Sequence, residues 1–159
     1  MNKTILVAED EQVVRESLAE LLTDEGYEVV QAEHGKAAHD LLLQRPVDLI
    51  LSDMRMPEMD GLQLLAHAKQ IAPQTPMIVM TAFGTVESAV SAMRAGAHDY
   101  LLKPVLFEDL IIKVQRALEF GEIVRTQHVI NEQLAQGSTF HDLVGESKAM
   151  AKLFDTVKK

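Results

Sequence analysis

Short runs of consecutive apolar residues alternate along the chain with segments whose apolar residues recur every three or four positions. The first pattern is typical of strands that are buried on both faces, and the second is typical of amphipathic helices. Strand, then helix, repeated five times predicts an α/β domain with a doubly wound parallel sheet and an extended C-terminal helix. The strands are expected at 5–8, 27–32, 49–53, 77–81 and 99–103, and the helices at about 14–26, 36–43, 62–71, 85–95 and 108–135.

The helix expected at 85–95 carries a single apolar stripe, which is interpreted as its packing face. Gly96 is well placed to end this helix, because glycine readily adopts the left-handed conformation that follows a helix C-terminus. The stripe consists of Val86, Ala89, Val90 and Met93.

The last expected helix is longer than a compact domain needs. Its first part can cover the sheet, and its second part continues to about residue 135 with apolar residues at roughly coiled-coil spacing. This second stripe has nothing to pack on within one copy, which suggests a homodimer through the helix; the alternative is a helix bent back onto its own domain. The first part carries Leu110, Val114 and Leu118, and the second carries Phe120, Ile123, Ile130 and Leu134.

Composition narrows the class of protein. The 159 residues suffice for one core and an appendage, and no apolar run is long enough to cross a membrane. No cysteine is present, and the N-terminus lacks the features of a secretory signal, so a cytoplasmic location is expected. A net charge of −9 argues against direct nucleic-acid binding by these residues, and the six histidines show no spacing typical of a zinc site.

Polar residues follow four of the expected strands. Glu9 and Asp10 follow the first strand, Asp53 ends the third, Thr81 ends the fourth and Lys103 ends the fifth. The carboxyl ends of parallel strands meet at one edge, so these side chains are expected to lie together. Three clustered carboxylates require a cation, and an all-oxygen site suits Mg²⁺ or Mn²⁺ better than zinc.

Such an edge has a definite chemical use. A divalent ion can neutralise phosphate oxygens while one carboxylate acts as a nucleophile, and Lys103 and Thr81 can stabilise the transferring group. No P-loop is present, so a nucleoside triphosphate is not the expected donor. Taken singly, each residue has a plainer interpretation: an aspartate can close a turn, an acid can favour a helix dipole and a threonine suits a strand.

Four motifs together resemble the receiver domain of two-component response regulators, over about residues 3–120. The resemblance implies the flavodoxin-like, or CheY-like, strand order 2-1-3-4-5. Many receivers carry two aspartates where this chain has a glutamate and an aspartate. The motifs are Glu9-Asp10, the stretch Asp-Met-Arg-Met-Pro-Glu-Met-Asp-Gly that begins at Asp53, Thr81-Ala82 and Lys103-Pro104.

The resemblance also implies roles for individual residues. Asp53 would accept a phosphoryl group from a histidine kinase, and Thr81 and Lys103 would be the switch hydroxyl and the phosphate-binding lysine. Tyr100 would be the switch aromatic. The Mg²⁺ ligands would be Glu9, Asp10, Asp53 and the backbone carbonyl of Arg55.

A narrower resemblance extends beyond the receiver. Residues 81–100 are similar to the receivers of NtrC-like activators of sigma-54 RNA polymerase, and residues 143–150 resemble the opening of their AAA+ ATPase domain. This implies a receiver at 1–120, a helical coiled-coil-like linker at 121–138 and a truncated start of the AAA+ domain at 139–159. No Walker A loop is present, so ATP hydrolysis is not expected here, and sigma-54 polymerase and DNA would be contacted only through further domains.

The expected function is therefore that of a phosphoacceptor and not of an enzyme with turnover. Phosphorylation of Asp53 would reshape the face formed by the fourth helix, fifth strand and fifth helix, and would alter dimer contacts. Two other classes stay open: a metal-dependent phosphatase or phosphotransferase that acts through an aspartyl phosphate, and a phosphorylation-independent interaction module.

Overall fold

The computed structural model describes the backbone of residues 2–82 and 86–136, and the side chains of residues 2–82 and 87–124. The expected start of an AAA+ domain at 139–159 and the end of the linker lie outside the described residues. So do the side chains of Val86, Ile130 and Leu134, which were assigned to apolar stripes.

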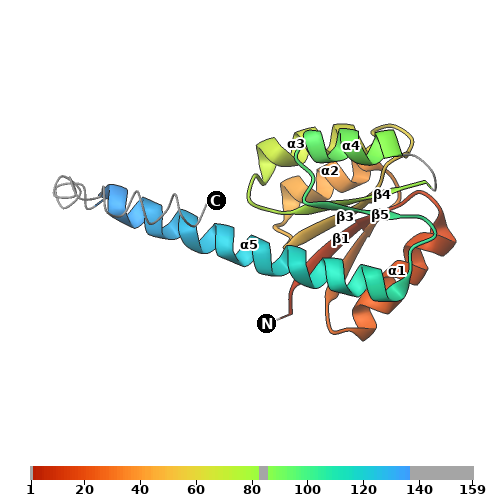
Figure 1. The fold of residues 1–159 in the computed structure, drawn as a ribbon, viewed down its shortest axis with the longest axis horizontal. Coiled ribbons are helices and arrows are strands. Elements are labelled where there is room, and N and C mark those ends of the chain that lie inside the picture. The colour runs from red at the N-terminus through yellow and green to blue at the C-terminus, as the bar shows by residue number, and fades with distance from the viewer. Residues whose placement is uncertain (1, 83–85, 137–159) are drawn as a thin grey trace. The chain divides into compact units, whose positions relative to one another are not determined.

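Each of the expected strands and helices is present, with ends within two residues of those predicted (Figure 1). The strands form one parallel sheet of order β2-β1-β3-β4-β5, which confirms the predicted fold class. The elements are β1 (Thr4–Ala8), α1 (Gln12–Asp24), β2 (Glu28–Ala32), α2 (Gly35–Gln44), β3 (Leu49–Asp53), α3 (Gly61–Ile71), β4 (Met77–Thr81), α4 (Val86–Arg94), β5 (Asp99–Leu102) and α5 (Phe107–Gln136).

The three inner strands explain the continuous apolar runs of the sequence. Every residue of β1, β3 and β4 is buried, whereas β2 and β5 at the edges are only partly covered. A strand with helices on both faces has no polar side to present to water, so its side chains do not alternate.

Helices cover both faces of the sheet, α2, α3 and α4 on one side and α1 and the start of α5 on the other (Figure 1). Each side has its own apolar core. The prediction that Leu110, Val114 and Leu118 cover the sheet is confirmed, because all three are buried in the core beneath α1 and α5.

The predicted packing face of α4 is wrong in part. Ala89 and Ala92 are buried, whereas Val90 and Met93 are 43% and 42% exposed. The two alanines lie three residues apart on one side of the helix, and their small side chains suit close packing against the sheet. Ranking positions by hydrophobicity alone favoured the larger valine and methionine, which instead remain at the surface.

Contacts divide the chain after Glu122. Residues 1–122 form one compact unit, and residues from 123 onward belong to a second. α5 contributes to both, since the helix continues to Gln136. Phe120 and Ile123, the first two members of the second apolar stripe, are 48% and 57% exposed.

Candidate functional site

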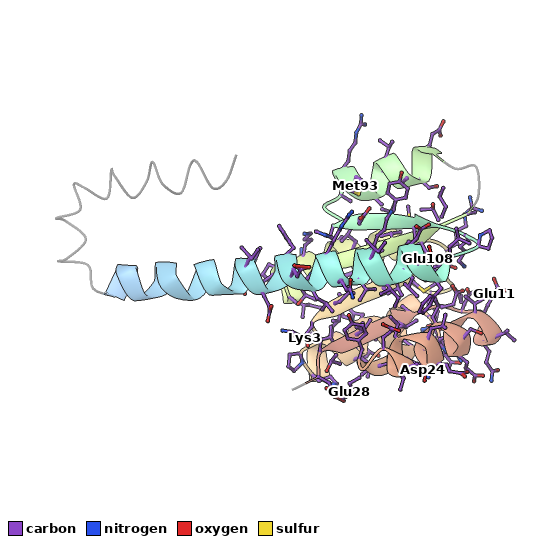
Figure 2. All side chains as sticks on the ribbon, turned by 60° about the horizontal axis from the view of Figure 1, so that its bottom comes forward. Lys3, Glu11, Asp24, Glu28, Met93 and Glu108 are labelled. Atoms are coloured by element: carbon purple, nitrogen blue, oxygen red, sulfur yellow. The ribbon has the colours of Figure 1, made fainter. Side chains whose placement is uncertain are left out.

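Three carboxylates meet at the carboxyl edge of the sheet. Each of Glu9, Asp10 and Asp53 offers an oxygen, and these oxygens all lie within 4.8 Å of one another. Glu9 and Asp53 are buried, while Asp10 is exposed. The strand ends predicted to converge therefore do converge. Figure 2 shows Glu11 and Glu108 at this end of the sheet, with Lys3 and Glu28 at the other end.

Lys103 joins the cluster from the end of β5. Its Nζ lies 2.9 Å from Glu9 Oε2 and 3.1 Å from Asp53 Oδ2. The ammonium is held between two acids from different strands, and most of its side chain is shielded from water. Burial by itself would lower the pKa of Lys103, but the hydrogen bond to Glu9 and the charge of Asp53 raise it on balance, so the lysine stays charged.

Glu9 is the most buried of the acids. Its side chain accepts a hydrogen bond from the backbone N–H of Glu11 at 3.2 Å, and the Arg15 guanidinium donates to its backbone carbonyl at 3.0 Å. Burial raises the pKa of Glu9 to about 7, and the charge of Asp53 acts in the same direction, against the effect of Lys103. Its burial distinguishes this glutamate from an acid that merely favours a helix dipole at the surface.

A tight turn after β3 fixes Asp53. Its Oδ1 accepts a hydrogen bond from the Met54 N–H at 2.8 Å, and the Gly61 N–H donates to the Met54 carbonyl at 2.9 Å. A Cβ atom at Gly61 would lie 2.5 Å from the Asp53 backbone oxygen, so only glycine fits this close approach. Asp60 and Gln63 form a capping box that starts α3 directly after the turn.

Asp53 and Lys103 line a cavity of about 200 Å³. Two of its lining residues were not singled out from the sequence: Ser88 in the first half of α4, and Glu11 at the start of α1. Ser88 is brought to the site only by the packing of α4 against the sheet, for which the sequence pattern gives no local signal, whereas Glu11 directly follows the predicted pair Glu9-Asp10 in the chain. The lining residues are Glu11, Asp53, Met54, Arg55, Ala82, Ser88 and Lys103.

Thr81 and Tyr100 lie on neighbouring strands near this edge. Thr81 is fully buried, and no described group lies within hydrogen-bond reach of its Oγ1. An unpaired buried hydroxyl is costly and uncommon in a native fold, so it needs an explanation. Tyr100 is half-buried on β5, and it pairs with Val79 two residues before Thr81.

The donor set fits a hard divalent cation. Three carboxylates and one ammonium carry a formal surplus of two negative charges, and all the anionic donors are oxygen. Mg²⁺ and Mn²⁺ prefer such ligands. Arg55 lines the same cavity, so its backbone is near enough to be considered with them.

The histidines contain one pair that sequence spacing did not reveal. The rings of His39 on α2 and His67 on α3 lie 4.8 Å apart, because the two helices are neighbours on one face of the sheet. Within residues 2–82 and 86–124, the only group of three or more potential metal ligands is the acidic cluster.

No helix in the described part of the chain is long and apolar enough to cross a membrane.

Comparison with known proteins agrees with this geometry. The response regulator receiver domain family matches residues 5–115. A five-stranded parallel sheet of order 2-1-3-4-5 with helices on both faces is the fold of such a domain. The chain belongs to the response regulator receiver domain family.

The relatives are transcriptional regulators. The chain is 36% identical over 97% of its length to the regulatory protein AtoC of Escherichia coli, and 37% identical over 94% to the DNA-binding transcriptional regulator NtrC of the same species. It covers 34% and 31% of those two proteins, about a third of their length. The crystal structure of NtrX from Brucella abortus superposes with a TM-score of 0.77 at 34% identity, covering 82% of this chain and 30% of NtrX.

Proposed function

We propose that Asp53 accepts a phosphoryl group from a histidine kinase, and that the chain is the receiver of an NtrC-like, sigma-54-dependent activator. One observation carries this proposal. The Asp53 carboxylate faces a cavity, oxygens of two further acids lie within 4.8 Å of it, and the Lys103 ammonium lies 3.1 Å from its Oδ2. A carboxylate so placed can act as a nucleophile toward phosphorus while its surroundings balance the charge.

In the proposed phosphoryl transfer, the two oxygens of Asp53 start with different partners. Oδ1 is bound by the Met54 N–H and Oδ2 by Lys103. A carboxylate oxygen attacks the phosphorus of a phosphohistidine, a P–O bond forms, the P–N bond breaks and the electron pair returns to the imidazole. The Lys103 ammonium then neutralises the negative charge of a phosphoryl oxygen instead of that of a carboxylate oxygen.

Glu9, Asp10, Asp53 and the Arg55 carbonyl would hold Mg²⁺, with Mn²⁺ as a substitute. When bound, the ion supplies positive charge for the phosphate oxygens. Asp10 is exposed and Glu9 is buried, so the two acids approach the ion from different depths. Lys103 already contacts Glu9 at 2.9 Å and Asp53 at 3.1 Å, which leaves Asp10 as the most accessible of the three acids.

Thr81 would be the hydroxyl that senses the phosphoryl group. Its oxygen is buried and has no described partner, and a phosphoryl oxygen on the next strand is an acceptor that would satisfy it. Movement of Thr81 would leave room for Tyr100 and reshape the face formed by α4, β5 and α5.

The remaining residues would connect this event to an output. We assign residues 1–120 to the receiver, 121–138 to a helical linker that dimerises, and 139–159 to the start of an AAA+ domain. The dimer is supported by the exposure of Phe120 and Ile123 and by the continuation of α5 to Gln136. The chain would meet the kinase and the polymerase in the cytoplasm. It would contact the polymerase and DNA only through further domains. The chain itself would have no turnover beyond its own phosphorylation and dephosphorylation.

Labelling with a small phosphodonor tests the assignment. In the presence of Mg²⁺ and acetyl phosphate, the parent chain should gain one phosphoryl group, measured by intact mass, and Asp53→Asn should gain none. Asp40→Asn is the matched control, because Asp40 is an exposed acid on α2. Normal labelling of the Asp53→Asn chain would overturn the proposal.

A further inference from the structure

Lys113, on α5, contacts two consecutive residues of the edge strand β5. Its Nζ donates a hydrogen bond to the backbone carbonyl of Tyr100 and lies 3.4 Å from Asp99 Oδ1. The same atom lies over the Tyr100 ring, 4.8 Å from the ring centre. One ammonium therefore contacts a carbonyl, a carboxylate and an aromatic face.

Two of these contacts fix the ammonium independently of where the ring points. The carbonyl belongs to the backbone of β5, and Asp99 is itself fixed because its Oδ1 accepts a hydrogen bond from the Tyr100 N–H at 2.8 Å. The side chains of Lys113 and Asp99 are each 27% exposed, so water screens this pair only in part. Because the ammonium is already held in place, its contact with the ring requires little further loss of conformational entropy.

The ring contact is the one that a movement of Tyr100 would break. Tyr100 lines an apolar cavity of about 410 Å³ together with Val90 and Met93 of α4, so it is not enclosed by tight packing. On the neighbouring strand, Thr81 has a buried hydroxyl without a described partner. A ring in these surroundings can leave Lys113 without displacing a close-packed core.

We propose that Lys113 is a positioning residue that holds the Tyr100 ring in the place seen here and thereby opposes the phosphorylated state. This inference rests on the proposed function of Asp53. If phosphorylation favours a different ring position, the contact between Lys113 and the ring must be lost, and linkage requires the reverse effect as well. Removing the charge of Lys113 should then favour the phosphorylated state.

The first experiment follows the ring itself. The chain has two tyrosines and no tryptophan, so Tyr27→Phe leaves Tyr100 as the only strong intrinsic fluorophore. In that background, Lys113→Met keeps the length of the side chain and removes its charge. Quenching of tyrosine fluorescence by acrylamide, without any phosphate mimic, should change in Lys113→Met and stay at the parent value in Lys113→Arg, because a guanidinium also stacks on aromatic rings.

The second experiment follows the linkage to Asp53. Calorimetric titration with fluoroberyllate and Mg²⁺, a mimic of the phosphoryl group, should show a midpoint about two- to fivefold lower in Lys113→Met than in the parent, the range expected for one partly exposed cation–π contact. Lys36→Met removes an exposed lysine from α2 and should leave the midpoint unchanged. In a Tyr100→Leu background, Lys113→Met should also have no effect, because the ring is gone.

The outcomes separate the two proposals. If the parent chain does not bind the mimic, the function assigned to Asp53 fails, while the quenching experiment still decides whether Lys113 positions the ring. Parent-like quenching and midpoint in Lys113→Met would overturn the inference. An equal shift in Lys36→Met, or a shift that persists in the Tyr100→Leu background, would overturn it too, because either would mean a general effect of charge or of structure.

Discussion

At the scale of single residues, the site depends on close contacts between Asp53 and its neighbours. Asp53 is held by the Met54 N–H on one oxygen and by Lys103 on the other, and Gly61 allows the turn to pass against the Asp53 backbone. The proposed nucleophile is therefore positioned by the backbone of its own loop as much as by other side chains. The proposed phosphoacceptor chemistry would thus have a rigid support.

Gly61→Ala tests this support. Its Cβ would lie 2.5 Å from the Asp53 oxygen and 2.9 Å from the Met54 Cα, both in the backbone, so the turn must shift. We expect the free energy of unfolding to fall by about 1–3 kcal/mol and labelling by acetyl phosphate to slow. Urea unfolding and the labelling rate measure the two effects. Gln70→Ala, at an exposed position of the same helix, should change stability by no more than about 0.5 kcal/mol. A fully stable, normally labelled Gly61→Ala chain would contradict this account.

Residues at the ends of strands could be found from the sequence, and residues that reach the site from helices could not. Glu9, Asp53 and Lys103 each follow an apolar run, and the geometry of parallel sheets places such positions at one edge. Ser88 and Lys113 stand in helical segments where every turn offers similar polar side chains. Only the packing of α4 and α5 against the sheet selects them.

At the scale of elements, the same limit appears in α4. Its helical period was correct, but its buried side was not, because the two alanines face the sheet while Val90 and Met93 lie at the surface. α1, α2, α3 and the start of α5 each carry larger buried side chains, so hydrophobicity marks their core faces more clearly. A helix that packs through alanine gives a weaker signal.

The contact between the start of β5 and α5 gives a prediction about pH. The ring of His98 lies 4.9 Å from that of Phe120, and burial lowers the pKa of His98, with Lys69 acting in the same direction and Asp99 opposing. The unfolded chain therefore takes up a proton at His98 at a higher pH than the folded chain does. As the pH falls through about 6.5, His98 should reduce the free energy of unfolding.

Urea unfolding at a series of pH values measures this effect. When the pH is lowered from about 7.5 to about 5.5, the free energy of unfolding should fall more in the parent chain than in His98→Gln. The other titrating groups are the same in both chains. Equal losses in the two chains would show that His98 is no less protonated in the folded state than in the unfolded one.

At the scale of the whole molecule, residues 1–122 hold both apolar cores and the entire acidic cluster. The proposed chemistry should therefore need nothing from residues beyond Glu122, whereas dimerisation should need the linker. The second apolar stripe of α5 was identified from the sequence alone, and Phe120 and Ile123 are the only two of its members whose side chains fall within the described residues.

Light scattering separates these two parts. We expect the 159-residue chain to have the molar mass of a dimer and residues 1–122 to have that of a monomer, while both are labelled by acetyl phosphate at similar rates. Adding fluoroberyllate and Mg²⁺, the mimic of the phosphoryl group, should alter the dimer contacts. A monomeric full chain at the same concentration would contradict dimerisation through the linker, and loss of labelling in residues 1–122 would contradict an independent receiver.

The central claim is that Asp53, and no other residue, carries the phosphoryl group. It is tested most directly by labelling the chain with acetyl phosphate and Mg²⁺, reducing the acyl phosphate with borohydride and locating the reduced residue by peptide mass spectrometry. We predict reduction at position 53 alone, dependent on Mg²⁺ and absent from Asp53→Asn. Reduction at Asp10 or at another acid, or none in the presence of Mg²⁺, would contradict the account.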